Sequence, residues 1–221
     1  MENKKLNTPT GTASYPHLTT PDSFMGAESY KCNLIIDASE TDFRSKVDAF
    51  VAASRKEALD AAEETLAALD PEAKSPKAKK AYEAAEALVN TIKDDEKYRT
   101  PLTEEWGDDD KPTGNWVLVT KSKASFKDHK SGEMISLAPK FFDAKAALME
   151  DRPLIKGGSR LNLGITLVAY SAGGAIGAGV TCRINAVQII KLSGGSSTGF
   201  ESQDSAGSDS EGFSPQESGV Y

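Results

Sequence analysis

The sequence predicts a mainly β protein: a small barrel that carries an inserted helical hairpin and ends in a disordered acidic tail. Short strand-like runs with Gly- and Asp-rich connections fill the region after residue 112, as in closed or partly open barrels. A helical pattern interrupts the strands only once, at about residues 40–95, whereas a doubly wound sheet needs a helix after nearly every strand. Residues 193–221 contain no Lys or Arg and are rich in Ser and Gly, which is typical of disorder.

The length predicts one domain with appendages. A chain of 221 residues with 38% hydrophobic content supports one modest core and disordered ends, and two full domains would be cramped. We therefore expect a domain over residues 1–192 and a tail over residues 193–221. The apolar runs are too short to span a membrane and the N-terminus lacks an apolar secretory core, so we expect a cytosolic protein without membrane contact.

The N-terminal part is expected to begin without regular structure. Residues 1–29 are rich in Thr, Pro, Ser and Gly, which predicts an extended or looping arm. The first firm element is a strand over Tyr30–Ile36, where apolar and polar positions partly alternate. Ser39 and Thr41 are candidate N-caps for the helix that follows.

The helical hairpin is predicted from apolar spacing. Apolar residues recur every three or four positions after residue 41, and Asp70-Pro71 is expected to end the first helix. A second helix begins near Pro76, because proline is tolerated in the first turn. Between Asp37 and Asp110, twenty acidic residues outnumber eleven basic ones, so this section is unsuited to touch phosphate. We interpret it as a solvated helix pair that covers the barrel; a dedicated docking surface is the alternative.

The pattern changes to strands after Pro112. Five are expected in this part of the chain. They cover Trp116–Thr120, Ala124–Phe126, Met134–Leu137, Leu161–Ala169 and Val180–Leu192. The glycine-rich segment Gly173–Gly179 lacks the glycine order and the Lys-Ser/Thr ending of a nucleotide-binding loop, so we interpret it as a hairpin connection.

Opposite charges are segregated along the chain. Lys111–Lys191 carries twelve basic and five acidic residues, although the formal net charge of the protein is -7. The tail holds five acids and an aromatic last residue; these are Glu201, Asp204, Asp209, Glu211, Glu217 and Tyr221. A basic core with a tethered acidic tail suits a nucleic-acid binder, because the tail can occupy the basic surface until a polyanion displaces it. A merely solubilising tail is the alternative.

A row of lysines marks the candidate binding surface. Period-two geometry sends Lys121, Lys123, Ser125 and Lys127 to one face of a strand. Lysines track phosphates as point charges, whereas rings such as Phe126, Tyr170 and Tyr30 can stack on bases. The alternative is a solvated strand face, and we expect Phe126 itself to point into the core.

A second basic segment surrounds two glycines. Lys156 and Arg160 flank Gly157 and Gly158 just before a strand, where backbone amides can approach a phosphate closely. An ordinary tight turn is the favoured interpretation of this segment.

Catalysis and metal binding are not expected. Cys32 and Cys182 lie in strand-like runs, which predicts buried, reduced thiols. His17 and His129 are far from each other and from any nucleophile motif, and the paired acids lie in solvated charge runs. We therefore expect a protein that is not an enzyme, with no metal and no cofactor.

Several short motifs, spread over most of the chain, match a known protein family in their order and spacing. They are Gly11-Thr12-Ala13, Pro21-Asp22, Tyr30-Lys31, Ala124-Ser125-Phe126, Asp128 with Lys130, the segment 151–161 (DRPLIKGGSRL), Leu167-Val168-Ala169-Tyr170 and Gly177-Ala178. In these motifs and in its aromatic end, the sequence resembles the replication single-stranded DNA-binding proteins of short-tailed lytic bacteriophages. The resemblance implies an OB-fold-like five-stranded barrel that binds single-stranded DNA in a basic cleft, without sequence preference.

The resemblance also implies individual contacts. Lys121 and Tyr170 fall where the family places a DNA-contacting lysine and a base-stacking tyrosine. A DNA-contacting arginine of the family falls at Ala27, so that contact is absent unless Lys31 or another cation replaces it. The family aromatic two positions after the lysine is here Lys123. The candidate DNA-binding residues are Lys121, Tyr170, Lys123, Lys127, Lys31, Arg160, Lys156, Phe126 and Tyr30. The second helix is an addition to the family pattern.

The family's tail implies partners. In relatives it docks on the phage DNA polymerase and the primase-helicase and competes with DNA for the cleft, and a homodimer is expected. The resemblance thus implies a role in DNA replication, recombination and repair, in the cytoplasm of an infected bacterium. We further expect Tyr221 and its carboxylate to anchor the tail in the cleft. An RNA-binding OB-fold module and a phage adaptor protein that binds no nucleic acid are the alternatives.

Overall fold

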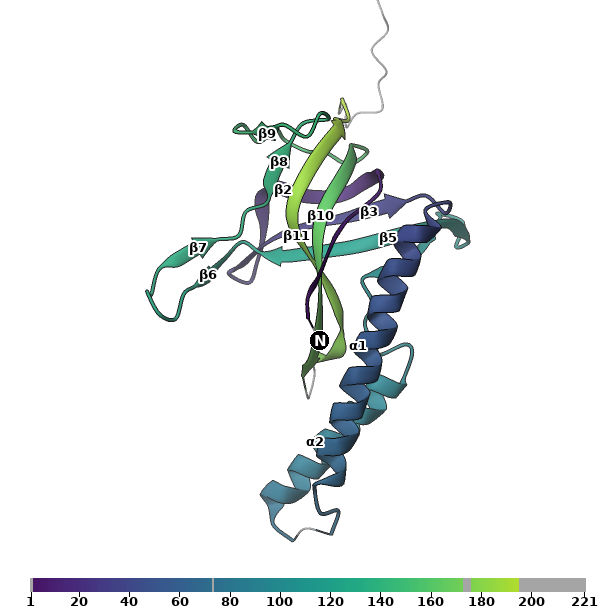
Figure 1. Cartoon of the computed structure of the whole chain (residues 1–221), viewed down its shortest axis with the longest axis vertical. Helices are drawn as coiled ribbons and strands as arrows, with labels where there is room; N and C mark the ends of the chain where they lie inside the picture. Colours follow the sequence, from purple (N-terminus) through teal and green to yellow (C-terminus); the bar gives the residue numbers. More distant parts are fainter. Residues whose placement is uncertain (1, 73, 173–175, 195–221) are drawn as a thin grey trace, which may run out of the picture.

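The computed structural model describes residues 2–72, 74–172 and 176–194, and its centre is a five-stranded barrel (Figure 1). The barrel strands are β2 (Gly11–Phe24), β3 (Ala27–Ile36), β5 (Pro112–Lys123), β10 (Arg160–Ala172) and β11 (Gly177–Lys191). They pair in the order β5-β3-β2-β10-β11. The ring closes between β5 and β11, where the Ser122 hydroxyl accepts a hydrogen bond from the Ile184 amide at 2.7 Å. This is the Greek-key connectivity of an OB-fold-like barrel, and the predicted fold class is confirmed.

Alternating side chains fill the barrel. On β3, Cys32, Leu34 and Ile36 are each at most 1% exposed, as is Leu118 on the neighbouring β5. Because side chains alternate across a strand, the residues between them point outward to solvent. The inner and outer faces of β3 and β5 are thereby fixed.

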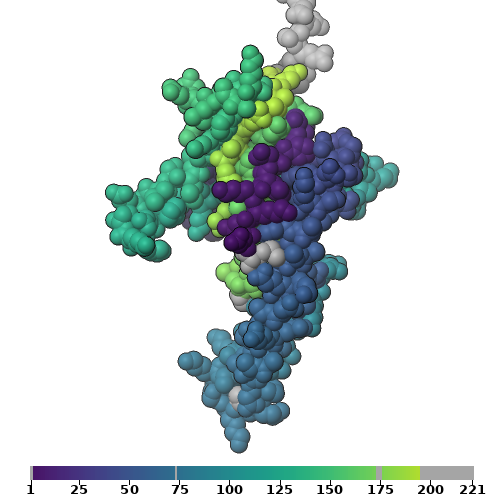
Figure 2. Space-filling model, viewed as in Figure 1, coloured from purple at the N-terminus to yellow at the C-terminus, as the bar shows by residue number. Residues whose placement is uncertain are grey.

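The helical insertion consists of α1 (Thr41–Ala67) and α2 (Pro76–Lys93). The first turns of α1 cover the barrel, because Phe43, Val47 and Phe50 belong to its core. The rest of the pair projects from the barrel and packs on a second, smaller core that includes Ile92 of α2. Figure 2 shows this pair as an arm below the barrel. The helices therefore cover the barrel at the start of α1 and, through the second core, pack against β11 at Ala178.

The helix ends differ in how well they were predicted. Helix α2 starts as expected, since the Ser75 hydroxyl accepts a hydrogen bond from the Ala78 amide at 3.2 Å. The predicted caps of α1 are wrong: its N-cap is Glu40 and makes no side-chain cap bond. The Ser39 hydroxyl instead donates to the Asp37 carboxylate at 2.6 Å, which removes it from the helix end.

The predicted N-terminal arm is wrong for most of its length. It forms β1 (Lys4–Asn7), which pairs with β10, and the 14-residue strand β2. The prolines of β2 are tolerated because the pairing with β3 shifts between Ser14 and His17 and again between His17 and Asp22, and such irregularities relieve the need for an amide donor. The composition of residues 1–29 therefore did not reveal this strand.

The later strands largely follow the prediction, with additions. β6 (Ser125–Lys127) and β7 (Met134–Ser136) form a hairpin, and β10 pairs with β11 up to Ala172 and Gly177. The predicted hairpin connection is thus confirmed at its described ends. Three short strands escaped prediction: β4 (Leu102–Trp106), β8 (Lys140–Phe142) and β9 (Leu148–Met149). Two to five residues are too few to show a period.

Both cysteines are buried and free, as predicted. Burial raises the pKa of each thiol, Cys32 and Cys182, to about 12. Since the thiolate is the nucleophile, we expect iodoacetamide at pH 8 to leave both cysteines of the folded protein unmodified and to alkylate both in urea, as measured by intact mass. Fast alkylation of either thiol in the folded protein would contradict this packing.

Candidate nucleic-acid interface

Two strands place three lysines together on the outside of the barrel. Lys31 on β3 lies opposite Lys121 on β5, and Ser29 lies opposite Lys123. Their side chains alternate with the buried residues of both strands, so Lys31, Lys121 and Lys123 share the outer face. Residues directly opposite one another have Cβ atoms about 5 Å apart. The structure thus brings together three of the predicted DNA-binding residues.

A fourth cation joins this row from β11. Arg183 is exposed and precedes Ile184, which the Ser122 hydroxyl binds from β5. Arg183 lies between the buried Cys182 and Ile184 and therefore points outward, beside the strand that carries Lys121 and Lys123. Sequence reasoning missed Arg183, since nothing in the sequence shows that β11 closes the barrel against β5. We name Lys31, Lys121, Lys123 and Arg183 the basic face.

One acid lies within this face. The Lys31 Nζ is 2.7 Å from Asp22 Oδ2. The hydrogen bond from Lys31 lowers the pKa of the Asp22 carboxyl, and the charge of Lys121 adds to the effect. Asp22 on β2 is therefore ionised at neutral pH and holds the Lys31 side chain of β3 in place. A phosphate that reached Lys31 would compete with this carboxylate.

The β6–β7 hairpin projects away from the barrel (Figure 1). A hydrogen bond of 3.0 Å from the Ala124 amide to the Glu28 carbonyl ties it to the barrel. Lys127 is exposed on β6, but it lies beyond the end of β5. The expected inward orientation of Phe126 is wrong, because its ring is 41% exposed. Among the described residues, none of the barrel core comes from this hairpin.

Tyr170 lies apart from the basic face. It pairs with Gly179 on β11, four residues from Arg183, which is about 13 Å along a strand. Its half-buried ring lines a shallow pocket with Tyr98 and with Ala58 of α1. Because of this spacing along β11, the described structure does not set Tyr170 in one row with Lys121.

Three other predicted residues fall outside the basic face. Tyr30 is only 7% exposed, so too little of its ring surface is accessible to stack on a base. Its side chain follows the parity of Cys32 and Leu34, which the sequence already showed. Lys156 and Arg160 flank a turn at the opposite end of the barrel, where Arg160 pairs with Thr12. Gly158 has a φ of 83°, which agrees with the tight-turn interpretation.

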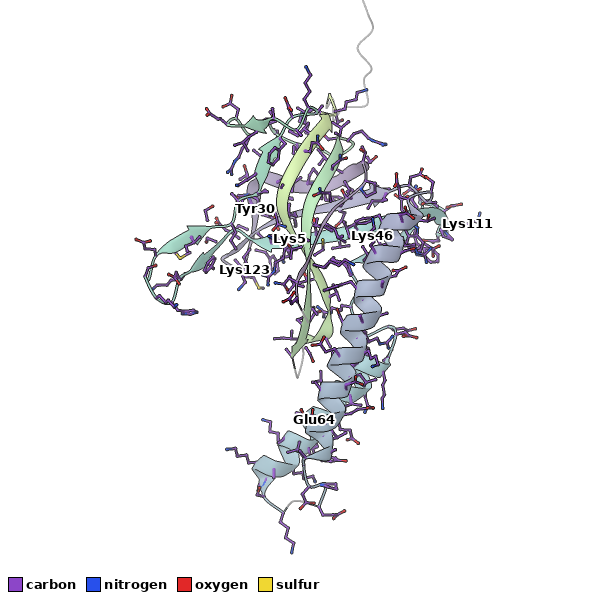
Figure 3. All side chains as sticks on the ribbon, viewed as in Figure 1. Lys5, Tyr30, Lys46, Glu64, Lys111 and Lys123 are labelled. Atoms are coloured by element: carbon purple, nitrogen blue, oxygen red, sulfur yellow. The ribbon has the colours of Figure 1, made fainter. Side chains whose placement is uncertain are left out.

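Among the side chains labelled in Figure 3, Lys123 belongs to the basic face, whereas Lys46 and Lys111 lie outside it. Lys123 and Lys111 lie at opposite ends of β5, and Lys46 lies on α1. Lys111 is held by Asp109 at 3.2 Å. Lys46 and Lys111 are therefore exposed cations outside the basic face and serve as reference positions for it.

The remaining predictions concern the tail, membranes and metals. The tail residues Glu201, Asp204, Asp209, Glu211, Glu217 and Tyr221 lie outside the described residues. Within the described ranges, no helix is long and apolar enough to cross a membrane. No three His, Cys, Asp or Glu side chains of the described residues gather in a way that would hold a metal ion.

Known proteins resemble this chain in sequence and in fold. It is 35% identical over 83 residues to the single-stranded DNA-binding protein of Escherichia phage T7, which covers 38% of this chain and 36% of the relative. It is 32% identical over 97 residues to the single-stranded DNA-binding protein of Enterobacteria phage T3, which covers 42% of each. The matched segments thus span less than half the length of either relative.

The crystal structure of gp2.5, a single-stranded DNA-binding protein encoded by bacteriophage T7, matches 90% of this chain and 98% of that chain. The TM-score is 0.64 at 22% sequence identity, so this likeness concerns the fold. The T7 and T3 relatives and the solved structure are all named for single-stranded DNA binding. The family described as single-stranded DNA-binding protein, bacteriophage T7, matches residues 11–192. That range includes the whole barrel and its helical insertion, and the chain therefore belongs to this family.

Proposed function

We propose that this protein binds single-stranded DNA without sequence preference and that the basic face is its phosphate-binding surface. The observation that carries the proposal is the register of three strands, which sets Lys31, Lys121, Lys123 and Arg183 on one outer face. Phosphates attract such cations regardless of base sequence, and each neutralised phosphate releases counterions. In OB-fold barrels the second and third strands, here β3 and β5, commonly form the ligand face.

The binding is proposed to serve phage DNA replication, recombination and repair in the cytoplasm of an infected bacterium. A protein that covers unwound strands protects them and keeps them from pairing. This part of the proposal is supported by membership in the family and by the names of the T7 and T3 relatives. An RNA-binding role would use the same cations and differs in its response to the 2′-hydroxyl.

We propose that the acidic tail binds first to the basic face of its own chain and then to replication enzymes. Its five acids complement the charge of the basic face, so the tail can occupy that face, with Tyr221 as an anchor, until DNA displaces it. Once displaced, it is free to recruit the phage DNA polymerase and the primase-helicase. A homodimer stays an expectation from the family.

Binding of a fluorescently labelled oligo-dT, measured across a salt series, tests this proposal. We compare the full chain with a chain that ends at Leu192, and we add unlabelled oligo-dT or oligo-rU as competitors. We expect tight binding with a logarithmic salt slope of about -0.7 per phosphate neutralised, tighter binding by the shorter chain, and weaker competition by RNA. Equal competition by oligo-rU would favour the RNA module. The adaptor protein predicts that neither chain binds at low salt.

A further inference from the structure

Tyr15 has an unusual backbone and an unusually exposed ring. Its φ is 47°, a left-handed conformation that is a genuine outlier for a bulky residue. Its side chain is 79% exposed. A residue keeps such a conformation only where the surrounding structure imposes it, and such residues cluster at functional sites.

The cause is an irregularity in the pairing of β2 with β3. Ser14 lies opposite Asn33 and His17 lies opposite Lys31, so two residues of β2 face one residue of β3. Such a bulge re-aims a side chain and is common next to functional sites. Here it turns an aromatic ring into solvent beside the strand that carries Lys31.

The orientation of the ring follows from its exposure. The inside of the barrel is filled by buried residues such as Leu18 of β2 and Leu34 of β3. A side chain that is 79% exposed therefore lies on the outer surface. The neighbouring outward residues on β3 are Asn33 and Lys31, and Lys31 belongs to the basic face.

A second exposed ring marks the other end of the same face. Phe24 is 68% exposed and ends β2. It lies two residues after Asp22, the ion-pair partner of Lys31, and period-two geometry keeps both on one side. Asp22 lies opposite Ser29, which in turn lies opposite Lys123. Phe24 thus flanks the Lys123 end of the basic face, and Tyr15 flanks the Lys31 end.

We infer that Tyr15 and Phe24 are base-stacking residues that border the basic face on β2. The inference rests on the proposed function and deepens it: cations on β3, β5 and β11 hold the phosphates, while rings on the adjacent strand receive the bases. Stacking accepts every base, because each has a π-face. Two solvent-exposed rings beside four cations match a single strand with free bases better than a duplex, whose bases are already stacked.

An experiment separates stacking from phosphate binding. The variants are Tyr15→Gly, which suits the left-handed backbone and keeps the strand intact, and Phe24→Ala. The control is Trp106→Ala, which removes another exposed ring, 63% exposed, on β4. Each full-length protein is titrated with labelled oligo-dT and with an abasic oligodeoxynucleotide of the same length, at several salt concentrations, and circular dichroism verifies folding.

We expect each variant to lose about 10-fold in affinity for oligo-dT, with no change in its salt slope and no loss for the abasic strand. The Trp106 variant and Tyr15→Phe should bind like the wild type. Unchanged oligo-dT affinity in both variants, or an equal loss for the abasic strand, would overturn the assignment of the rings. If the wild type itself bound neither strand, the proposed function would fail instead, so the two failures are distinguishable.

Discussion

Reversing two charges, in the double variant Lys121→Glu/Lys123→Glu, should weaken the binding of oligo-dT by about 100-fold or more at moderate salt. Both lysines are exposed on the outer side of β5, so the variant replaces two attractive contacts by two repulsive ones. The logarithmic salt slope should also become shallower by about 1.4, which is the contribution of two phosphates on a single strand. Fluorescence anisotropy across a salt series measures both quantities.

The matched control is Lys46→Glu/Lys111→Glu, which changes the net charge of the protein by the same amount. Lys46 lies on α1 and Lys111 next to the far end of β5 (Figure 3). Since all four lysines are exposed, neither double variant should change the free energy of unfolding by more than about 0.5 kcal/mol per site. Equal losses of affinity in the two double variants would show that net charge, and not the basic face, governs binding.

The second large effect concerns the junction between the helical arm and the barrel. Gly179 of β11 lies against Arg99, whose amide donates to the Ala178 carbonyl at 3.1 Å and whose carbonyl accepts from the Val180 amide at 2.8 Å. A Cβ on residue 179 would lie 2.4 Å from the Arg99 carbonyl oxygen, closer than atoms can approach. Gly179→Ala should therefore lower the free energy of unfolding by about 3 kcal/mol.

Urea denaturation followed by circular dichroism measures this loss. Gly157→Ala is the control, because the nearest atom to its added Cβ is 3.9 Å away, and its effect should stay within about 1 kcal/mol. Equal stability of the two variants would mean that the segment after α2 does not bear on β11 as described.

The barrel, its single insertion and the start of α2 were predictable because local signals set them. Ser75 and Pro76 form a cap and a first turn without help from the rest of the chain, and the alternation on β5 already grouped Lys121 with Lys123. β2 was not predictable, since its prolines and glycine read as a loop and only pairing with β3 and β10 makes it a strand.

The candidate interface was predictable in part for the same reason. Parity within one strand places its own lysines, but the position of Arg183 beside them depends on the closure of β11 against β5. The exposed position of the Tyr15 ring depends on a bulge that no local sequence pattern predicts. Phe126 was misjudged because its parity is that of a core residue, whereas the strand has left the barrel at that point.

Lysine footprinting tests the location of the binding surface most directly. The chain that ends at Leu192, in which no tail can shield the basic face, is acetylated briefly, with and without saturating oligo-dT, and each lysine is quantified by mass spectrometry. Binding to the basic face predicts strong protection of Lys31, Lys121 and Lys123 and unchanged labelling of Lys46 and Lys111. Protection confined to the exposed lysines at the start of α2, Lys77, Lys79 and Lys80, with Lys121 and Lys123 labelled as before, would contradict it.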